Sequence, residues 1–237
     1  MGLRKIIKVF EKGSVYVCGK RGTGKDLLFA NVVVRRKKPY VSMTDYGGQF
    51  IPFDYSAIDL NGNTYDDFIR GTLKPFKWPY EDGTDFYMPD SGVYFPSQYC
   101  NELNKKYPSV PMVQALIRHL SLAGWHSNCQ APMRVWDKIR EQYDNFIMCK
   151  GCFWVGPFVI QKIIVYDRFE AFSKNVPVFP LPKPLFNRDR MFQYQIQKAN
   201  YLIAHGEIKS HILIYRNKSK YNTRAFKEML ENAKTEN

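Results

Sequence analysis

The chain has 237 residues, with 35 Lys and Arg against 22 Asp and Glu, so its formal net charge is +13 at neutral pH. This length suits one α/β domain with an appendage better than two full domains. The excess of cations favours contact with a polyanion or an anionic membrane surface. No apolar run approaches the roughly 20 residues that span a bilayer, and five scattered cysteines do not resemble a disulfide framework. We therefore expect a cytoplasmic protein without a transmembrane segment.

A glycine-rich loop follows the first predicted strand, residues 14–18, and precedes an apolar helix that reaches residue 34. The loop and the helix start comprise Gly19, Lys20, Arg21, Gly22, Thr23, Gly24, Lys25 and Asp26. Glycines let successive N–H groups turn toward an anion, the helix N-terminus adds its positive end, and Lys25 can reach terminal phosphates. The spacing matches the phosphate-binding P-loop except that Asp26 replaces the hydroxyl that holds magnesium. The sequence predicts nucleotide binding through residues 19–26, with an ordinary glycine turn as the alternative.

The next segments are a basic run, a second strand and an irregular insert. The run 35–38 is Arg-Arg-Lys-Lys, which complements the dipole at the end of the helix, and a DNA contact is the alternative. Residues 39–43 read as the second strand. Residues 44–83 are rich in Asp, Asn, Gly, Pro and aromatics, which predicts an irregular insert with a short helix at about 66–70.

A short apolar run over residues 85–88 leads to an acidic residue, Asp90. In P-loop ATPases this position supplies the aspartate that organises magnesium, and a following glutamate activates water. Here Ser91 stands where that glutamate would be, and Pro89 is awkward in a central strand because it cannot donate to the ladder. The role of Asp90 is open on this pattern alone.

The following elements are predicted from periodicity and from turn residues. We expect an amphipathic helix over 111–123 that ends at Gly124, a strand over 125–130, a short helix over 135–142, and strands over 145–148 and 158–166. His-x-x-Cys and Cys-x-x-Cys spacings suit a tetrahedral zinc site made of His126, Cys129, Cys149 and Cys152. The alternative is that these cysteines are small core residues.

The composition changes after residue 167. Four prolines between 177 and 184 predict a semi-rigid linker, followed by helices over 188–205 and 223–233 that flank a β-like segment, 210–215. Basic residues with a tyrosine between 216 and 224 form a solvated surface or a nucleic-acid contact. We divide the chain into a nucleotide-binding domain (1–170), a Pro-rich linker (171–186) and a small basic C-terminal extension (187–237).

The order of these elements resembles the zonula occludens toxin-like family, the P-loop assembly ATPases of filamentous phages, which are related to hexameric DNA-pumping ATPases. Three segments carry the resemblance, residues 19–26, 88–91 and 117–132, the last of which contains an Arg-His pair, a glycine, a strand and Gln-x-Pro. The match covers about residues 15–150. It departs from the family at Asp26, at Ser91 and in lacking a membrane-spanning segment.

The resemblance implies an α/β P-loop NTPase fold of the RecA/ASCE type, with a mostly parallel sheet flanked by helices. It implies that Lys25 binds the β and γ phosphates of ATP, that Asp90 helps hold Mg²⁺, and that Gln130 senses the γ-phosphate or positions water. Asp26 can also offer a carboxylate oxygen to Mg²⁺. Arg118 or Arg140 would serve as an arginine finger for a neighbouring subunit, which implies a homo-oligomeric ring.

Two functions follow. The first is an ATPase of a bacteriophage or mobile element that couples hydrolysis to DNA translocation in virion assembly or packaging, in the host cytoplasm and beside a membrane-bound assembly partner. The second is a hydrolysis-impaired nucleotide- or nucleic-acid-binding scaffold, which the residues Asp26 and Ser91 favour. A small-molecule kinase would need an arginine-rich lid, which the sequence does not show.

Overall fold

A computed structural model describes most of the chain, namely residues 2–54, 60–76, 78–91, 97–106, 108–115, 123–130, 135, 140, 142–185 and 187–219. Five predictions lie wholly or partly outside these residues: the second half of the helix expected over 111–123, the position of Arg118, most of the helix expected over 135–142, the basic segment 216–224 beyond residue 219, and the helix expected over 223–233.

The described residues form one eight-stranded sheet in the order β3-β2-β4-β5-β1-β6-β7-β8. The strands are β1 (Val15–Gly19), β2 (Tyr40–Ser42), β3 (Phe50–Pro52), β4 (Asp85–Met88), β5 (Gly124–Cys129), β6 (Asn145–Val155), β7 (Phe158–Tyr166) and β8 (Ile208–Arg216). All neighbouring strands from β3 to β6 are parallel. Because β5 lies between β1 and β4, the carboxyl ends of these three strands meet at one edge of the sheet.

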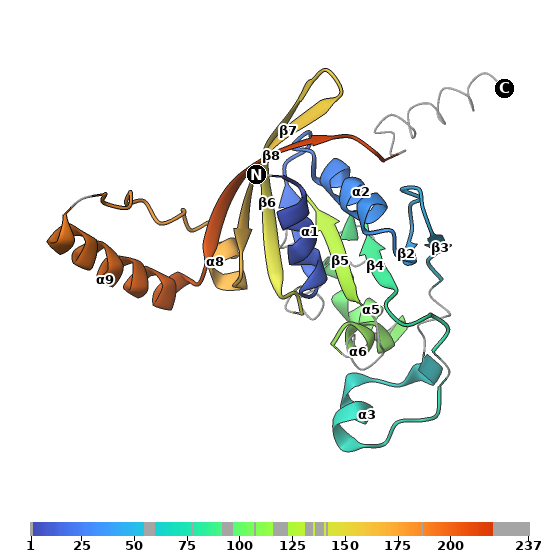
Figure 1. Cartoon of the computed structure of the whole chain (residues 1–237). Coiled ribbons are helices and arrows are strands. Elements are labelled where there is room, and N and C mark those ends of the chain that lie inside the picture. Colours follow the sequence, from blue (N-terminus) through green and yellow to red (C-terminus); the bar gives the residue numbers. More distant parts are fainter. Residues whose placement is uncertain are drawn as a thin grey trace.

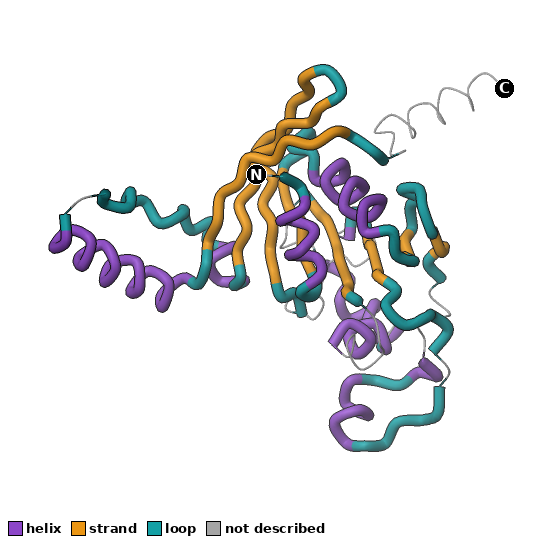
Figure 2. The backbone as a smooth tube through the Cα atoms, viewed as in Figure 1, coloured by secondary structure: helices purple, strands orange, loops and turns teal. Residues whose placement is uncertain are grey.

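Helices cover both faces of this sheet, as Figures 1 and 2 show. The described helices are α1 (Arg4–Glu11), α2 (Lys25–Arg36), α3 (Tyr65–Arg70), α5 (Cys100–Lys106), α6 (Ser109–Ala115), α8 (Phe169–Ser173) and α9 (Arg188–His205), with 3-10 turns η2 (Leu60–Gly62) and η3 (Ser97–Tyr99), and of these α3 and α9 lie away from the sheet. One core cluster joins Phe10 of α1 and Leu28 of α2 to the sheet, and the other joins Val113 of α6 and Phe172 of α8. The strands β1, β4 and β5 are buried along their whole length.

The strands β6, β7 and β8 are antiparallel and form the other side of the sheet. The hairpin of β6 and β7 extends beyond the end of β1 and lies at the top of Figure 1, and α9 stands away from the sheet. Residues 174–185 return along α9, where Phe179 packs against Tyr194 and Tyr201 with ring centroids 5.6 and 5.3 Å apart. No residue of α9 is buried. Of the helices in the described part of the chain, none combines the length and the hydrophobicity that crossing a bilayer requires.

The structure confirms the predicted α/β class, the mostly parallel sheet, the strand–loop–helix order at residues 14–34 and the bounds of β7 and α9. It differs in three places. Residues 50–52 of the expected irregular insert form β3 and pair with β2, and the strand expected over 125–130 runs from Gly124 to Cys129. The strand expected over 145–148 continues to Val155, because β7 supplies a partner for its whole length.

Candidate nucleotide-binding site

The glycine loop between β1 and α2 has the backbone shape that an anion cradle needs. Gly22 and Gly24 have φ of +80° and +78°, in the left-handed region that glycine adopts without strain. A Cβ at Gly22 would meet no atom within 4 Å, so this side of the loop is open. The Gly24 carbonyl accepts the N–H of Leu28 at 2.8 Å, which starts α2 directly behind the loop. The positive end of this 12-residue helix therefore faces the loop.

Residues from β6, β7 and β8 support the loop from behind. The side chain of Gln161 on β7 is fully buried and donates through Nε2 to the carbonyl of Thr23 at 3.0 Å. The hydroxyl of Tyr215 on β8 donates to Gln161 Oε1 at 3.0 Å. A Cβ on Gly24 would lie 2.7 Å from Cys152 Sγ on β6. The antiparallel strands thus hold the conformation of the loop, a role that local sequence patterns did not indicate.

Lys25 and Asp26 form an ion pair at the start of α2. Lys25 Nζ lies 2.9 Å from Asp26 Oδ2, and the side chains are 7% and 24% exposed. An acid in the first turn also stabilises the helix through its dipole. A phosphate that binds the Lys25 ammonium therefore has to compete with the Asp26 carboxylate.

Asp90 lies after β4 and is held by the end of β5. Its N–H donates to Asn128 Oδ1 at 2.9 Å, and its φ of 44° is strained for a residue with a Cβ. Burial raises the pKa of the Asp90 carboxyl, the nearby Asp26 raises the same pKa further, and Lys25 lowers it. The structure thus brings Lys25, Asp26 and Asp90 within electrostatic reach of one another.

Asn128 was not predicted as a site residue. It is fully buried, and its backbone carbonyl accepts the hydroxyl of Ser91 at 3.1 Å. Its Nδ2 has no hydrogen-bond partner among the described residues, which is costly for a buried donor. An unpaired amide donor beside Asp90 is what a site that takes an anion or a water would contain. The sequence signal was three consecutive polar residues, 126–128, in a strand that is otherwise apolar.

The other predicted site residues, Gln130 and Arg140, make contacts outside the glycine loop. Gln130 directly follows β5, its side chain is exposed, and its carbonyl accepts the Cys18 thiol at 3.6 Å, which joins the end of β5 to the end of β1. Arg140 is half-buried, with its guanidinium 5.2 Å from the ring centroid of Phe169 and its Nη1 3.5 Å from the carbonyl of Val135. Arg118 lies outside the described residues.

The carboxylates of Asp26 and Asp90 could hold a magnesium ion, because Mg²⁺ is commonly bound by one or two carboxylates together with phosphates and water. Within the described ranges, no group of three or more His, Cys, Asp and Glu is placed to hold a metal ion. The zinc alternative of His126, Cys129, Cys149 and Cys152 is therefore wrong. His126 takes part in a buried ion-pair network instead, and burial raises the pKa of the Cys149 thiol, which disfavours the thiolate that binds zinc.

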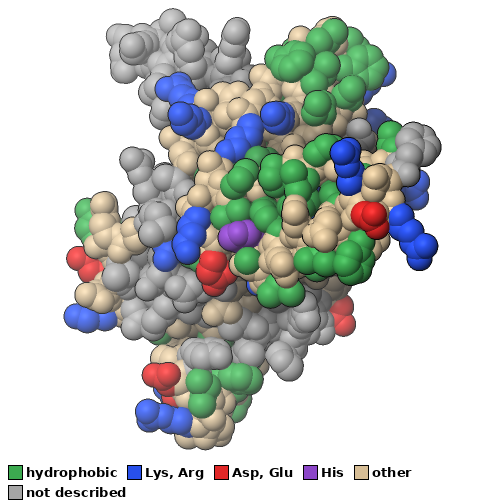
Figure 3. Space-filling model, turned by 90° about the vertical axis from the view of Figure 1, so that its left-hand side faces the viewer, with side chains coloured by type: hydrophobic (Ala, Val, Ile, Leu, Met, Phe, Trp, Pro, Cys, Tyr) green, Lys and Arg blue, Asp and Glu red, His purple; other side chains and the backbone are tan. Residues whose placement is uncertain are grey.

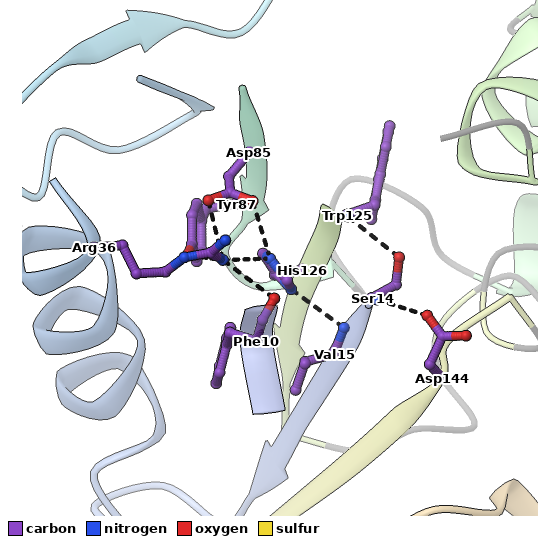
Figure 4. A network of polar contacts seen from close by, with 9 residues as sticks. All are labelled: Phe10, Ser14, Val15, Arg36, Asp85, Tyr87, Trp125, His126 and Asp144. Carbon is purple, nitrogen blue, oxygen red and sulfur yellow. Dashed lines mark hydrogen bonds and ion pairs between the residues drawn. The ribbon is translucent and has the colours of Figure 1, made fainter. Parts of the chain in front are cut away.

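That network connects α2 to β4 and β5 (Figure 4). Arg36 Nη1 lies 3.0 Å from Asp85 Oδ2, and both side chains are at most 3% exposed. Arg36 also donates to the Phe10 carbonyl at 3.3 Å and to the Tyr87 hydroxyl at 3.2 Å. The basic run at the end of α2 therefore does more than complement the helix dipole, because Arg36 ties the P-loop helix to the strand that leads to Asp90.

His126 is neutral in this network. Its Nδ1 accepts the N–H of Val15 at 3.2 Å, so this nitrogen carries no proton, and its Nε2 lies 3.4 Å from Asp85 Oδ1 as a donor. If Nδ1 were also protonated, its N–H would point at the N–H of Val15, and two donors would face each other without an acceptor. Burial lowers the pKa of His126, although Asp85 acts in the opposite direction.

This lowered pKa predicts that the protein loses stability as the pH falls. Below about pH 6.5 the unfolded chain protonates His126 while the folded chain does not, so the free energy of unfolding decreases by up to about 1.4 kcal/mol per pH unit down to the folded pKa. Urea unfolding at about pH 8 and about pH 5 measures this decrease in the free energy of unfolding. The His126→Gln variant, which keeps an acceptor and a donor, should show a smaller decrease. Equal decreases in the two proteins would contradict this account.

The strand order and the glycine loop together define an α/β protein of the P-loop NTPase fold class. No protein-family model matches the sequence, and no curated protein matches it either. Solved structures similar to the chain include the N-terminal domain of zonular occludens toxin from Neisseria meningitidis, at 11% identity and a TM-score of 0.44, over 91% of this chain and 97% of that one.

Two further structures are similar. One is the genome packaging NTPase B204 from Sulfolobus turreted icosahedral virus 2 in complex with ATP-gammaS, at 15% identity and a TM-score of 0.39, over 65% of this chain and 91% of that one. The other is EssC (ATPases 2 and 3) from Geobacillus thermodenitrificans, at 11% identity and a TM-score of 0.42, over 96% of this chain and 43% of that one.

Proposed function

We propose that the protein is an ATPase of a bacteriophage or mobile element that couples ATP hydrolysis to DNA translocation during virion assembly or packaging. The observation that carries the proposal is the convergence of the open glycine loop and Lys25 with Asp90 and the unpaired Nδ2 of Asn128, at the carboxyl ends of neighbouring parallel strands. The net charge of +13 supports a polyanionic partner. A homo-oligomeric ring in the host cytoplasm, beside a membrane-bound assembly partner, belongs to the same proposal.

Each residue has a role in this mechanism. The N–H groups of residues 19–24 and the Lys25 ammonium bind the β and γ phosphates. Asp90 and Asp26 would hold Mg²⁺, which when bound neutralises charge on the phosphate oxygens. Gln130, at the end of β5, positions the attacking water. Arg118 or Arg140 stabilises the transition state from a neighbouring subunit.

The alternative is a scaffold that binds nucleotide without cleaving it. Ser91 favours it, because this side chain is fully buried, donates to a backbone carbonyl and offers no carboxylate to activate water. The ion pair between Lys25 and Asp26 favours it as well, because it offsets the charge that would bind phosphate.

Release of phosphate from ATP, with Mg²⁺ and with or without DNA, separates the two functions. We expect the wild type to release phosphate, and DNA to increase the rate. The Lys25→Ala variant should bind ATP about tenfold to a hundredfold more weakly, because it loses a charge-assisted hydrogen bond to phosphate. Lys38→Ala, at an exposed position two residues beyond the end of α2, is the matched control. Turnover no higher than that of Lys25→Ala would remove the ATPase proposal, and Lys25-dependent binding without turnover would establish the scaffold.

The Asp26→Asn variant reports on the carboxylate in the same assay. If Asp26 supplies a metal ligand, the variant needs a higher Mg²⁺ concentration for turnover. If Asp26 acts as a partner of Lys25 alone, the variant binds ATP more tightly in the presence of a chelator and keeps its Mg²⁺ dependence.

A further inference from the structure

The tip of the β6–β7 hairpin is an exposed apolar surface. Phe153, Trp154, Val155 and Phe158 are 57%, 54%, 55% and 47% exposed, and Gly156 and Pro157 form the turn between them. In Figure 3, hydrophobic side chains cover the uppermost described part of the molecule, at the height where Figure 1 places this hairpin. Contiguous apolar surface of this kind marks a site of interaction with a partner or a membrane. We call Phe153–Phe158 the hairpin tip.

The topology explains why the hairpin tip is uncovered. The strand β1 ends at Gly19, opposite Cys149, so the six residues of β6 that follow have no partner on that side of the sheet among the described residues. They pair with β7 alone, down to the last pair, Val155 with Phe158. Because β6 continues past the end of β1, the β6–β7 turn lies at an extremity of the molecule, with the end of β8 at Arg216 beside it.

Both faces of the hairpin are apolar at the tip. Side chains alternate along a strand, so Phe153 and Val155 lie on one face and Trp154 on the other, and all three are more than half exposed. A protein partner that packs on a sheet covers one face. An apolar end with aromatic residues on both faces instead suits a medium that surrounds it, as the interfacial region of a bilayer does for Trp and Phe.

The charge near the hairpin tip is positive. None of the strands β6, β7 and β8 contains Asp or Glu, and each contains at least one Lys or Arg. Two exposed cations are close to the tip along the strands: Arg216 is registered with Phe158, and Lys162 with Ile212, which is itself 58% exposed. An apolar end with two cations behind it is complementary to anionic headgroups over hydrocarbon. Phe153, Trp154 and Phe158 could stack on nucleic-acid bases, but the aliphatic Val155 and Ile212 beside them could not, and this mixed surface favours lipid over DNA.

We propose that the hairpin tip inserts into the interface of an anionic lipid bilayer and so holds the protein at a membrane surface. The aromatic side chains enter the region between headgroups and acyl chains, and Lys162 and Arg216 contact the headgroups. This site is separate from the nucleotide-binding residues, although β6 and β7 also support the glycine loop.

Cosedimentation of the full chain with vesicles tests the proposal. We expect binding to vesicles of phosphatidylcholine with phosphatidylglycerol and much weaker binding to phosphatidylcholine alone. The Phe153→Ser/Trp154→Ser variant should bind about tenfold more weakly for each aromatic residue removed, and Lys162→Gln/Arg216→Gln about fivefold more weakly for each cation. The matched control is Ile203→Ser, which removes an apolar side chain of α9 that is 74% exposed and should leave binding unchanged.

Trp154 gives a second measurement that does not depend on loss of binding. Acyl chains that carry bromine should quench the fluorescence of the bound protein, and Trp154→Phe should abolish most of this quenching while it keeps the affinity. Equal circular dichroism spectra and melting temperatures show that the variants fold.

The proposal would be overturned by absence of binding to anionic vesicles, by equal binding of the hairpin-tip variant and the wild type, or by bromine quenching that persists in Trp154→Phe. Dissociation of an oligomer by the hairpin-tip variant, without vesicle binding by the wild type, would also overturn it and would assign the tip to a contact between copies of the chain.

Discussion

We expect the Arg36→Met variant to lose about 3–5 kcal/mol of its free energy of unfolding, a large part of the stability of an ordinary domain. Methionine keeps the length and apolar bulk of the side chain but leaves the Asp85 carboxylate buried without its partner at 3.0 Å. The Tyr87 hydroxyl and the Phe10 carbonyl lose a donor at the same time. Urea unfolding near neutral pH measures the effect.

Two further variants decide whether the cost comes from the unpaired charge. Lys38→Met makes the same change of charge two residues later at an exposed position, and should change stability by less than about 0.5 kcal/mol. In the double variant Arg36→Met/Asp85→Asn the carboxylate is gone as well, so part of the lost stability should return. If the double variant is as unstable as the sum of the two single variants, the Arg36–Asp85 interaction does not explain the effect.

The sequence predicted the parts of this molecule that depend on local patterns. The glycine spacing of residues 19–26, the apolar strands around it and the acid after β4 are signals that depend on neighbours within a few residues, and the structure contains the corresponding strand, loop and helix. The bounds of α9 were predictable for the same reason, since a capping Asn187 precedes it and Gly206 follows it.

The contacts that hold the site could not be predicted, because they join segments far apart in the chain. Thr23 and Gln161 are 138 residues apart, and Arg36 reaches a strand that begins at Asp85. A glutamine on a strand or an arginine at a helix end is ordinary in sequence, and its partner is known only once the strand order is known. Asn128 is an intermediate case, since polar residues in a buried strand were visible but their partners, Asp90 and Ser91, were not.

The loop itself allows the sharpest comparison, between Gly24→Ala and Gly22→Ala. Both glycines have φ near +80°, so an alanine at either position carries a left-handed strain of about 1–2 kcal/mol. At Gly22 the new Cβ has no atom within 4 Å, whereas at Gly24 it would lie 2.7 Å from Cys152 Sγ and 3.0 Å from Gln161 Nε2. Overpacking adds about 1–3 kcal/mol, so Gly24→Ala should lose about 2–5 kcal/mol in all.

Urea unfolding and ATP binding measured on both variants would separate conformational strain from steric contact with the antiparallel strands. We expect Gly24→Ala to lose more stability than Gly22→Ala, and to lose ATP binding as well, because Gln161 can no longer hold the Thr23 carbonyl at 3.0 Å. Equal losses would mean that strain alone determines the cost and that β6 and β7 do not set the shape of the loop. An unequal loss would show that the phosphate cradle depends on strands more than a hundred residues away, beyond the reach of the motif from which it was recognised.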